Sequence, residues 1–406
     1  MSKRCAAILS ISAFCIVLPW TPVDAQWRGA QRDGIYTGEN LLDAWPDGGP
    51  ALLWSTEEIG AGFSSAAVTA DRIYITGMTD GTGYLFAFDH EGKLIWRSAY
   101  GPEWSDSYPG ARTTPVVVGN RIYLMSAMAN VVCFGTDGKK VWSVDAAQQF
   151  GAKQLKWGMT ESLLVDGDTV FCTPGGPDAT VVALNRHTGK VLWQSKTNGQ
   201  TSTYCSPGLI THNGRRLLVT MTGRSAIGLD RDTGEFLWER KHITKYDINP
   251  NTPLYHDGHL YIVSGYGTGG QMLKLNADGT GVEQVWAQST LDSQMGSAVL
   301  IDGYLYGSGQ KNRGWHCVSW ETGEVTHTAK ALGNKGNIIY ADGMAYCYGE
   351  KGEVGLVKLS SDAFEVVSSF KVEKGSAQHW AHLVIRDGRL YVRHGEALMV
   401  YDIAAE

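Results

Sequence analysis

The stretch PALLW, residues 50–54, decides the fold because it repeats the end of a longer unit whose beginning is missing around it. The same ending, a Gly-containing turn followed by a strand with Trp, recurs as HEGKLIW (90–96), TDGKKVW (136–142), HTGKVLW (187–193) and DTGEFLW (232–238). Each of these copies follows roughly thirty residues of a recurring pattern. PALLW follows only residues 1–49, which lack it. PALLW is therefore the last strand of a unit whose other strands lie elsewhere in the chain.

A second repeated feature is a short turn followed by an aromatic strand. It occurs eight times, 40 to 49 residues apart, at TADRIY (69–74), VGNRIY (118–123), DGDTVF (166–171), HNGRRL (212–217), HDGHLY (256–261), IDGYLY (301–306), ADGMAY (341–346) and RDGRLY (386–391). Asp-Gly and Asn-Gly pairs between alternating apolar runs are strong hairpin signals, because the tight turn needs positive φ at both central residues. Each unit therefore begins with a β-hairpin.

The complete unit contains four strands. An apolar strand, the aromatic strand after the turn and a third strand such as VVALN (181–185) precede the Thr-Gly turn and the Trp-bearing strand. Four antiparallel strands in about 45 residues form the blade of a β-propeller rather than a helical repeat. No segment has sustained helical periodicity, so we expect very little helix.

The last unit explains the position of PALLW. Residues 377–403 supply three strands of an eighth blade, and the fourth is missing. We predict that residues 50–57 pair with this blade and close the ring, which also covers an otherwise exposed sheet edge. The predicted fold is all-β, an eight-bladed β-propeller of four-stranded antiparallel blades over residues 50–406, preceded by an extension at 26–49.

Residues 1–25 have the pattern of a secretory signal peptide. A basic start precedes an apolar run from Cys5 to Trp20, and small residues end the segment at Ala25. The apolar run is short for a membrane span, and no later run approaches spanning length. We therefore expect cleavage near Ala25, no membrane span, and a periplasmic or secreted protein.

Charge and cysteine content exclude some classes of protein. The chain has a net charge of −6 and no basic cluster, which argues against binding to nucleic acid or anionic membranes. The five cysteines after the signal peptide are Cys133, Cys172, Cys205, Cys317 and Cys347, none in a CxxC pair. Four of them lie in strand-like apolar runs, so we interpret them as small buried residues.

The turn before the Trp strand carries a family pattern. The pattern Asp/Asn-x-x-Thr-Gly, with Trp four residues after the glycine, occurs at Asn185–Trp193 and Asp230–Trp238. It resembles the tryptophan-docking repeat of pyrroloquinoline-quinone (PQQ) propellers, and the resemblance extends over residues 52–403. The stretch QWRGAQRDGIYTG (26–38) is similar to the start of exported PQQ-like propellers. One branch of this superfamily comprises quinoprotein alcohol dehydrogenases, with PQQ and calcium on the propeller axis. Another comprises cofactor-free propellers such as the assembly lipoprotein of the β-barrel machinery.

Two features of the enzyme branch are missing from the sequence. No two cysteines are neighbours, whereas quinoprotein alcohol dehydrogenases typically have a vicinal pair, and the large insertions that cover their site are absent. Their calcium ligands have no matching motif here. A convincing lipobox is also lacking. We therefore expect a cofactor-free monomer that binds a small molecule, polysaccharide or protein, and we keep a PQQ- and calcium-dependent alcohol or polyol dehydrogenase as the alternative.

Candidate ligand-binding residues come from the segments just before each innermost strand, which line one mouth of a propeller channel. The candidates are Arg112, Trp157, Glu161, Tyr204, Asn249, Asn251, Gln294, Asn337, His379, Trp380 and His382. Trp157 or Trp380 would stack on a planar ligand, Arg112 would pair with a carboxylate and Glu161 would act as a general base. In the alternative interpretation, which we favour, these groups only line the channel and are satisfied by water and one another.

Three further features have competing interpretations. The insertion at 101–110 offers Trp104 and Tyr108 as rim contacts for a ligand, or as aromatics packed on neighbouring blades. His379 and His382 are three residues apart, so on a strand they would point to opposite faces, and we expect no metal site. The Trp at one repeat position per blade indicates packing between blades rather than a sugar-binding platform.

Overall fold

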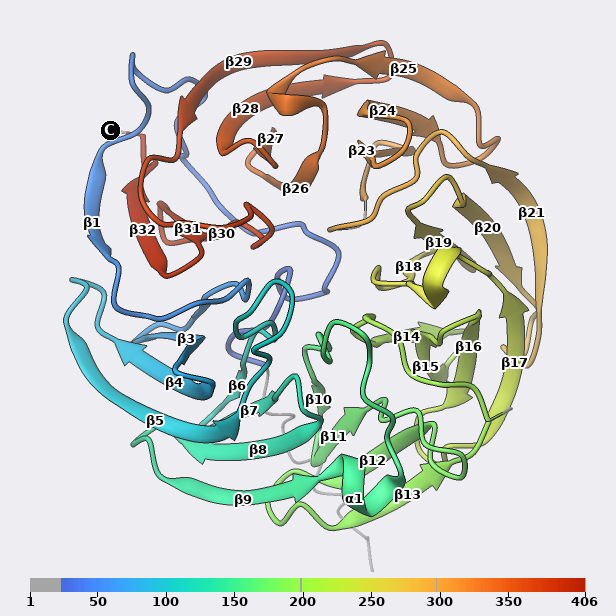
Figure 1. Cartoon of the computed structure of the whole chain (residues 1–406). Helices are drawn as coiled ribbons and strands as arrows, with labels where there is room; N and C mark the ends of the chain where they lie inside the picture. Colours follow the sequence, from blue (N-terminus) through green and yellow to red (C-terminus); the bar gives the residue numbers. More distant parts are fainter. Residues whose placement is uncertain (1–22, 198, 297, 406) are drawn as a thin grey trace, which may run out of the picture.

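The computed structural model describes residues 23–197, 199–296 and 298–405, and it contains eight four-stranded antiparallel sheets arranged in a ring (Figure 1). The prediction of an eight-bladed β-propeller is confirmed. In every blade the strands are hydrogen-bonded in sequence order from the channel outward, with the N-terminal strand added as the outermost strand of the last blade. The inner strands are mostly buried and the outer strands alternate in exposure, so the core lies between neighbouring blades.

The first four blades follow one another along the chain. Blade 1 comprises β2 (Ala67–Val68), β3 (Ile73–Thr79), β4 (Thr82–Phe88) and β5 (Leu94–Pro102). Blade 2 comprises β6 (Val116–Val118), β7 (Arg121–Met125), β8 (Asn130–Gly135) and β9 (Lys140–Asp145). Blade 3 comprises β10 (Leu164–Asp166), β11 (Thr169–Cys172), β12 (Val181–Asn185) and β13 (Val191–Ser195). Blade 4 comprises β14 (Gly208–His212), β15 (Arg215–Met221), β16 (Ser225–Asp230) and β17 (Phe236–Lys241).

The last four blades complete the ring. Blade 5 comprises β18 (Leu254–His256), β19 (His259–Ser264), β20 (Gly269–Leu275) and β21 (Val282–Gln288). Blade 6 comprises β22 (Val299–Ile301), β23 (Tyr304–Gly309), β24 (Gly314–Ser319) and β25 (Val325–Ala329). Blade 7 comprises β26 (Gly336–Ala341), β27 (Met344–Gly349), β28 (Glu353–Ser360) and β29 (Ala363–Lys371). Blade 8 comprises β30 (Val384–Arg386), β31 (Arg389–His394), β32 (Ala397–Asp402) and β1 (Leu52–Thr56).

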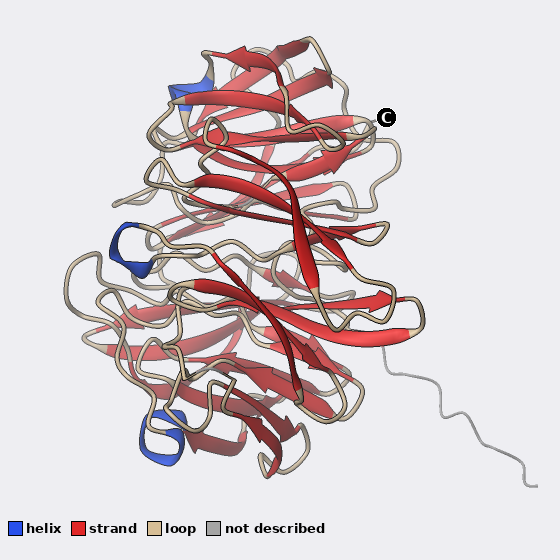
Figure 2. Ribbon diagram, turned by 90° about the vertical axis from the view of Figure 1, so that its right-hand side faces the viewer, coloured by secondary structure: helices blue, strands red, loops and turns tan. Residues whose placement is uncertain are grey.

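The two faces of the ring differ. Asp-Gly and Thr-Gly turns lie on one face, here called the turn face. The connections from each fourth strand to the next blade lie on the other, here called the helix face, together with α1 (Ala146–Phe150) and the short 3-10 helices η1 (Lys245–Asp247) and η2 (Leu332–Asn334) (Figure 2). Within the described residues, none of the helices is both long and apolar enough for a membrane crossing.

Blade 8 closes as the sequence predicted. Strand β1 pairs antiparallel with β32, in a register that places Leu52 opposite Tyr401 and Thr56 opposite Leu398. The amide of Asp402 adds a hydrogen bond of 2.8 Å to the carbonyl of Ala51. This pairing satisfies the outer edge of β32 and joins the two ends of the chain.

A buried arginine adds a second link across the closure. Arg393 lies on β31 and is 2% exposed. Its guanidinium group donates to the Thr76 carbonyl at 2.6 Å, to the Ser64 hydroxyl at 2.5 Å and to the Gly60 carbonyl at 3.2 Å, all in blade 1 or the segment leading into it. Blade 8 is therefore held to blade 1 by buried hydrogen bonds as well as by apolar packing.

The repeated Trp residues pack between blades, as predicted. Trp54, Trp96, Trp142, Trp193 and Trp286 each lie against a turn glycine of the next blade, at Gly92, Gly138, Gly189, Gly234 and Gly323 respectively. These glycines have φ between 70° and 85°, and a Cβ on any of them would come within 2.8 Å of the indole. In four of the five pairs the indole N–H donates to a carbonyl in the same turn or next to it. Glycine is required there both for backbone conformation and for space.

Trp238 packs differently from the other members of the series. Its ring covers Gly228 on the neighbouring strand of its own blade, where a Cβ would approach the indole to 2.1 Å. The side chain is 5% exposed and belongs to an apolar cluster that includes Ile262 and Leu273 of blade 5. Trp238 therefore joins blades 4 and 5 through apolar packing rather than through a turn glycine.

The five cysteines lie in the core of the propeller. All five described cysteines are buried and unpaired, as small core residues are. Most of the predicted signal peptide lies outside the described residues. Ala25, the expected cleavage position, lies inside them and forms a β-bridge with Val117 of blade 2.

The Trp–Gly contacts generate a stability prediction. We expect Gly92→Ala to lower the free energy of unfolding by about 2–4 kcal/mol, because the methyl group meets Trp54 at 2.5 Å in addition to the strain of a positive φ. Gly303→Ala is the matched control: its φ of 81° is close to the 85° of Gly92, but nothing lies within 4 Å of the added methyl. It should lose only about 1 kcal/mol. Urea unfolding of both variants measures the difference, and equal losses contradict the docking role of Trp54.

Candidate functional site

The helix-face mouth of the channel is ringed by aromatic and polar side chains that come from all eight blades. We call this ring the collar. It consists of Phe63, Tyr108, Arg112, Trp157, Tyr204, Tyr246, Tyr266, Gln294, Lys335, Glu350 and Trp380. Most of these residues precede an innermost strand, where the chain enters a blade beside the axis.

One arc of the collar is built around Trp380. Its ring contacts Phe63 at a centroid distance of 5.2 Å and Tyr108 at 5.0 Å. The guanidinium carbon of Arg112 lies 5.5 Å from the centre of the Phe63 ring, a cation–π arrangement. Burial lowers the pKa of Arg112 to about 10, and the group stays charged at neutral pH. This arc offers flat apolar faces beside one positive charge.

A second arc consists of aromatic residues from blades 3 to 5. Trp157 lies 6.2 Å from Tyr204 and 6.4 Å from Tyr246, and Tyr246 lies 5.9 Å from Tyr266, measured between ring centroids. The ammonium group of Lys156 sits 4.8 Å from the Trp157 ring. Tyr246 is 58% exposed. The rings therefore form a surface that a ligand reaches directly from solvent.

A polar arc joins the two aromatic arcs. The Gln294 amide donates to the Tyr266 hydroxyl at 2.7 Å and accepts from the Lys335 ammonium at 2.8 Å. Lys335 also forms an ion pair with Glu350 at 2.7 Å, and the Trp380 indole N–H donates to the same carboxylate at 3.3 Å. The charges of Lys335 and Glu350 compensate each other, so this arc orders the collar without adding net charge.

Beneath the collar the channel narrows to a cavity of about 170 Å³. Its walls include Phe63, Arg112, Tyr204, Gln294, Met295 and Trp380. Trp27 and His382 also line it, with their rings 5.2 Å apart in an edge-on contact. Trp27 belongs to the N-terminal extension, so the extension reaches the floor of the cavity from the turn face and makes the cavity blind.

The N-terminal extension is held in the channel by two buried arginines. Arg28 is 1% exposed, and its guanidinium group donates to carbonyls of blades 6 and 7: Gly296, Ala298 at 3.0 Å and Ile338 at 3.2 Å. A further bond of 2.8 Å reaches the carbonyl of Asp33. Burial lowers the pKa of Arg28 to about 10, but the cation persists at neutral pH because four carbonyl oxygens surround it.

Arg32 makes the corresponding contacts on the opposite side of the ring. It donates to the carbonyls of Ser162 at 3.0 Å, Leu163 and Pro207 at 3.1 Å, which precede the innermost strands of blades 3 and 4. Its Nε donates to the Gln26 amide oxygen at 2.8 Å. The two arginines therefore tie four blades to one short segment on the axis.

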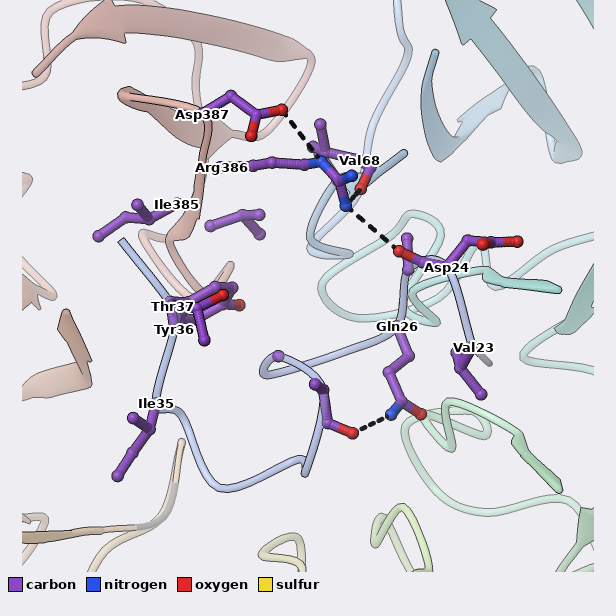
Figure 3. Close-up of a pocket in the computed structure, with 15 residues that line it drawn as sticks. Val23, Asp24, Gln26, Ile35, Tyr36, Thr37, Val68, Ile385, Arg386 and Asp387 are labelled. Atoms are coloured by element: carbon purple, nitrogen blue, oxygen red, sulfur yellow. Dashed lines mark hydrogen bonds and ion pairs between the residues drawn. The ribbon is translucent and has the colours of Figure 1, made fainter. Parts of the chain in front are cut away.

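Two cavities flank this segment on the turn face, with volumes of about 260 and 470 Å³. Figure 3 shows the smaller one, between the extension and the ends of blades 8 and 1. Arg386 crosses it and bonds to the Asp387 carboxylate at 3.3 Å and to the carbonyls of Asp24 at 3.4 Å and Val68 at 3.1 Å. The Arg386 side chain at this wall is therefore engaged with the protein itself.

The predicted site residues separate into a group at the mouth and a group beneath it. Arg112, Trp157, Tyr204, Gln294 and Trp380 come together in the collar. Glu161 lies in the protein interior and is 1% exposed, where its carboxylate accepts from the Thr173 amide at 2.9 Å. Burial raises the pKa of Glu161 to about 8, against its ordinary value of 4.5. The structure does not place this carboxylate where a general base would meet a ligand in the collar.

The three predicted asparagines are also buried, and their amides join backbone segments. The Nδ2 atoms donate to carbonyl oxygens as follows: Asn249 to Thr222 and Gly223, Asn251 to Val263 and Ser293, and Asn337 to Ala381. Several of these bonds connect one blade to the next. These side chains set the positions of the loops that carry the collar.

His379 and His382 point into different surroundings. His379 forms a 2.6 Å hydrogen bond between its Nδ1 and the Tyr348 hydroxyl and stacks on His394 with ring centroids 3.7 Å apart. His382 faces Trp27 in the channel. Burial lowers the pKa of both histidines, to about 4 for His379 and well below the ordinary value for His382. In the part of the chain that the structure describes, no three His, Cys, Asp or Glu side chains group so as to hold a metal ion.

The insertion at 101–110 has one aromatic residue that packs on the protein and one that is exposed at the rim. Trp104 is 9% exposed, packs beside Gly158 and donates its indole N–H to the Ser107 carbonyl at 2.9 Å. Tyr108 is 43% exposed and contacts Trp380 in the collar. Trp104 therefore anchors the loop and Tyr108 is its exposed tip.

Sequence reasoning missed the residues that close the channel and several members of the collar. Trp27, Arg28 and Arg32 lie in the extension, where the phrase QWRGAQRDG places two arginines four residues apart among glycines. Charged residues in an otherwise turn-like segment before a propeller were a usable signal. Phe63 lies just before the innermost strand of blade 1, a position that the repeat marks, whereas Tyr266 lies between β19 and β20 in a loop without a repeated pattern.

Known proteins support the fold and give it a family. The model of the family described as outer membrane protein assembly factor BamB matches residues 81–329, more than half of the chain. The chain belongs to this family. Its blades are therefore those of a PQQ-like repeat propeller of the BamB type.

Curated relatives include both branches of the superfamily. The outer membrane protein assembly factor BamB of Kangiella koreensis is 28% identical over 50% of this chain and 49% of its own length. The quinoprotein ethanol dehydrogenase of Pseudomonas aeruginosa is 24% identical over 58% of this chain and 36% of its own length. The chain thus spans about half or less of the curated relatives it matches.

Solved structures show the same fold. BamB from Moraxella catarrhalis superposes with a TM-score of 0.60 over 87% of this chain and 99% of that one, at 16% identity. The quinohemoprotein alcohol dehydrogenase ADHIIG from Pseudomonas putida superposes with a TM-score of 0.65 over 93% of this chain and 79% of that one, at 12% identity. At these identities the likeness concerns the propeller and not its chemistry.

The collar and cavity do not fit PQQ with calcium. PQQ is a planar tricarboxylate, so it needs a flat slot and several cations, and calcium takes six to eight oxygen ligands. In the described residues, the axis below the collar is filled by Trp27, Arg28 and Arg32, and the cavity above them holds about 170 Å³. Arg112 is the cation on the cavity wall, Lys335 and Glu350 in the collar neutralise each other, and Lys156 and Lys245 lie farther out, over the aromatic arc.

The axial arginines generate a second stability prediction. We expect Arg28→Met to lower the free energy of unfolding by about 2–4 kcal/mol, since it leaves several buried carbonyls of blades 6 and 7 without a donor. Arg313→Met, at an exposed position on blade 6, is the control and should change stability by less than about 0.5 kcal/mol. Denaturant unfolding of both variants measures the two free energies of unfolding. An Arg28 variant as stable as the control contradicts the anchoring role.

The buried carboxyl of Glu161 generates a pH prediction. Its folded pKa of about 8 exceeds the ordinary 4.5, so the folded protein holds a proton that the unfolded chain releases. Between those values the contribution of Glu161 to stability therefore falls as pH rises, by up to about 1.4 kcal/mol per pH unit. Glu161→Gln should remove this slope. The free energy of unfolding, measured at pH 5 and pH 8.5, should rise in the variant relative to the wild type at the higher pH. If the free energies of both proteins change equally with pH, the raised pKa of Glu161 is wrong.

Proposed function

We propose that this protein is a non-catalytic binding module that takes a polypeptide segment at the collar. The observation that carries the proposal is the collar itself, a ring of aromatic and polar side chains contributed by all eight blades above a blind cavity, most of them half-buried and Tyr108 and Tyr246 exposed. Tyr and Trp are enriched where proteins bind one another, because they bury large rigid surfaces and keep a polar group available.

The size of the cavity supports a polypeptide over a free cofactor. Small-molecule pockets usually enclose about 300–1,000 Å³. The cavity of about 170 Å³ has room for one ring of an inserted side chain, while the rest of a bound segment would lie across the collar. The family described as an assembly factor for outer membrane proteins points in the same direction. A secretory signal in residues 1–25 is consistent with work outside the cytoplasm, in the periplasm or as a secreted protein.

A PQQ-dependent alcohol or polyol dehydrogenase is the second candidate. It is favoured by the relative from Pseudomonas aeruginosa, whose name describes a quinoprotein ethanol dehydrogenase. The filled axis, the small cavity and the compensated charges of Lys335 and Glu350 weigh against it. These observations support a protein that needs no PQQ or calcium to function.

The proposal is tested with an unfolded, cysteine-free polypeptide of near-zero net charge as the probe. We expect saturable binding to the intact protein, measured by calorimetric titration. The double variant Trp157→Ala, Trp380→Ala should weaken it at least tenfold, because each aromatic truncation at a binding centre removes about 1–2 kcal/mol. Phe236→Ala, which removes an exposed aromatic side chain from an outer strand, is the control and should leave the affinity unchanged.

Two results contradict the proposal. One is equal binding by the collar variant and the control, which would place the probe elsewhere. The other is catalytic turnover. After incubation with PQQ and calcium, we expect no dye reduction above background with a panel of alcohols. Saturable PQQ binding with alcohol-dependent dye reduction would establish the dehydrogenase.

A further inference from the structure

The collar carries an asymmetric distribution of charge, and the inference drawn from it rests on the proposed function. Lys156 and Lys245 lie beside the aromatic arc of blades 3 to 5, with their ammonium groups 4.8 Å from the Trp157 ring and 4.9 Å from the Tyr246 ring. Lys156 also lies 5.7 Å from the Tyr246 ring. Both lysines are exposed. Two cations therefore stand over adjacent rings of one arc.

Arg112 places a third cation on the other side of the cavity. Its side chain donates to the carbonyls of Tyr108 and Ser107 and lies over Phe63. Neither Arg112, Lys156 nor Lys245 forms an ion pair with any residue that the structure describes. All three charges are therefore available to a ligand.

The acidic residues near the collar are already engaged. Glu103, the carboxylate that interacts with Arg112, is 4% exposed and accepts from the Tyr100 hydroxyl and from the amides of Trp104 and Ala127. Glu350 pairs with Lys335 at 2.7 Å, and Asp247 lies 3.9 Å from Arg224. The Asp106 carboxylate accepts from the Ser107 amide at 2.8 Å. In a chain with a net charge of −6, the aromatic arc is thus a local cationic surface. Its potential attracts negative groups and repels positive ones.

We propose that the collar selects an extended acidic segment of a partner polypeptide, in which an aromatic side chain is flanked by aspartate or glutamate. The aromatic ring enters the cavity between Phe63, Tyr204 and Trp380. The flanking carboxylates pair with Lys156, Lys245 and Arg112.

The spacing of the groups suits an extended chain. Tyr204 lines the cavity and contacts Trp157, and the Lys156 ammonium group lies over the Trp157 ring. The Trp157 ring therefore lies between the cavity wall and this lysine. Extended backbone advances about 3.3 Å per residue. Carboxylates one to three residues from the anchor therefore reach the cationic arc while the anchor stays inserted. A carboxylate beside a cation that already faces a ring completes a charge-assisted contact on the open side of that cation.

The experiment uses four synthetic peptides of one length, blocked at both ends and embedded in Gly-Ser flanks. Their centres are Asp-Asp-Phe-Asp-Asp, Asn-Asn-Phe-Asn-Asn, Lys-Lys-Phe-Lys-Lys and Asp-Asp-Ala-Asp-Asp. Calorimetric titration of the full chain should rank the acidic aromatic peptide first. We expect at least fivefold weaker binding for the Asn and Ala peptides and none detectable for the Lys peptide. Added salt should weaken the first peptide more than the Asn peptide.

Charge-removing variants locate the effect on the protein. The double variant Lys156→Met, Lys245→Met should weaken the acidic aromatic peptide about tenfold and leave the Asn peptide unchanged. Lys140→Met, Lys190→Met is the matched control, because both lysines are exposed near the turn face. It should change neither affinity. Far-ultraviolet circular dichroism and the unfolding midpoint verify that each variant is folded.

The outcomes separate this inference from the proposed function. If the near-neutral unfolded polypeptide binds at the collar but the four peptides bind equally, selection for acidic segments is wrong and the binding module stands. If neither that polypeptide nor any peptide responds to the Trp157 and Trp380 changes, both proposals are wrong. Tighter binding of an acidic polysaccharide such as polygalacturonate than of every peptide would also overturn the inference.

Discussion

The architecture depends on the antiparallel pairing of β1 with β32. A propeller whose last blade had three strands would expose the long edge of β32 and would leave the ends of the chain free to separate. Taking the missing strand from the N-terminus makes every blade equivalent and turns the ring into a closed structure. Arg393 strengthens the same junction by bonding to blade 1 at Gly60, Ser64 and Thr76. Closure of the ring is therefore a matter of backbone pairing and buried hydrogen bonds together.

Closure also determines what happens on the axis. Fourth strands run from the turn face to the helix face, so β1 begins on the turn face and the residues before it must lie there. From that position the extension enters the channel, where Arg28 and Arg32 bond to blades 6 and 7 and to blades 3 and 4. The channel becomes blind, and the collar of the helix face is left as its open end. The pairing that completes blade 8 therefore also determines which end of the channel stays open for binding.

The candidate site was predictable in part. Arg112, Trp157, Tyr204, Gln294 and Trp380 lie in the collar because each precedes an innermost strand, and the repeat marks those positions. Glu161 and Asn249 precede innermost strands as well, yet both are buried, since one accepts from the Thr173 amide and the other donates to the carbonyls of blade 4. Spacing identifies the loop, but the direction of a side chain depends on which neighbouring backbone groups lack a partner. That information is distributed over several blades.

The sequence by itself determined the number of blades, the strands in each and the partner of the displaced strand at 50–57. These features follow from local chemistry that recurs along the chain: tight turns with positive φ, alternating apolar strands and, in most blades, a Trp on the fourth strand. Only the tertiary structure decided that the extension closes the channel and which polar side chains face the mouth. Those outcomes depend on which backbone carbonyls of distant blades accept hydrogen bonds from the non-repeating extension. No local sequence pattern specifies these long-range contacts.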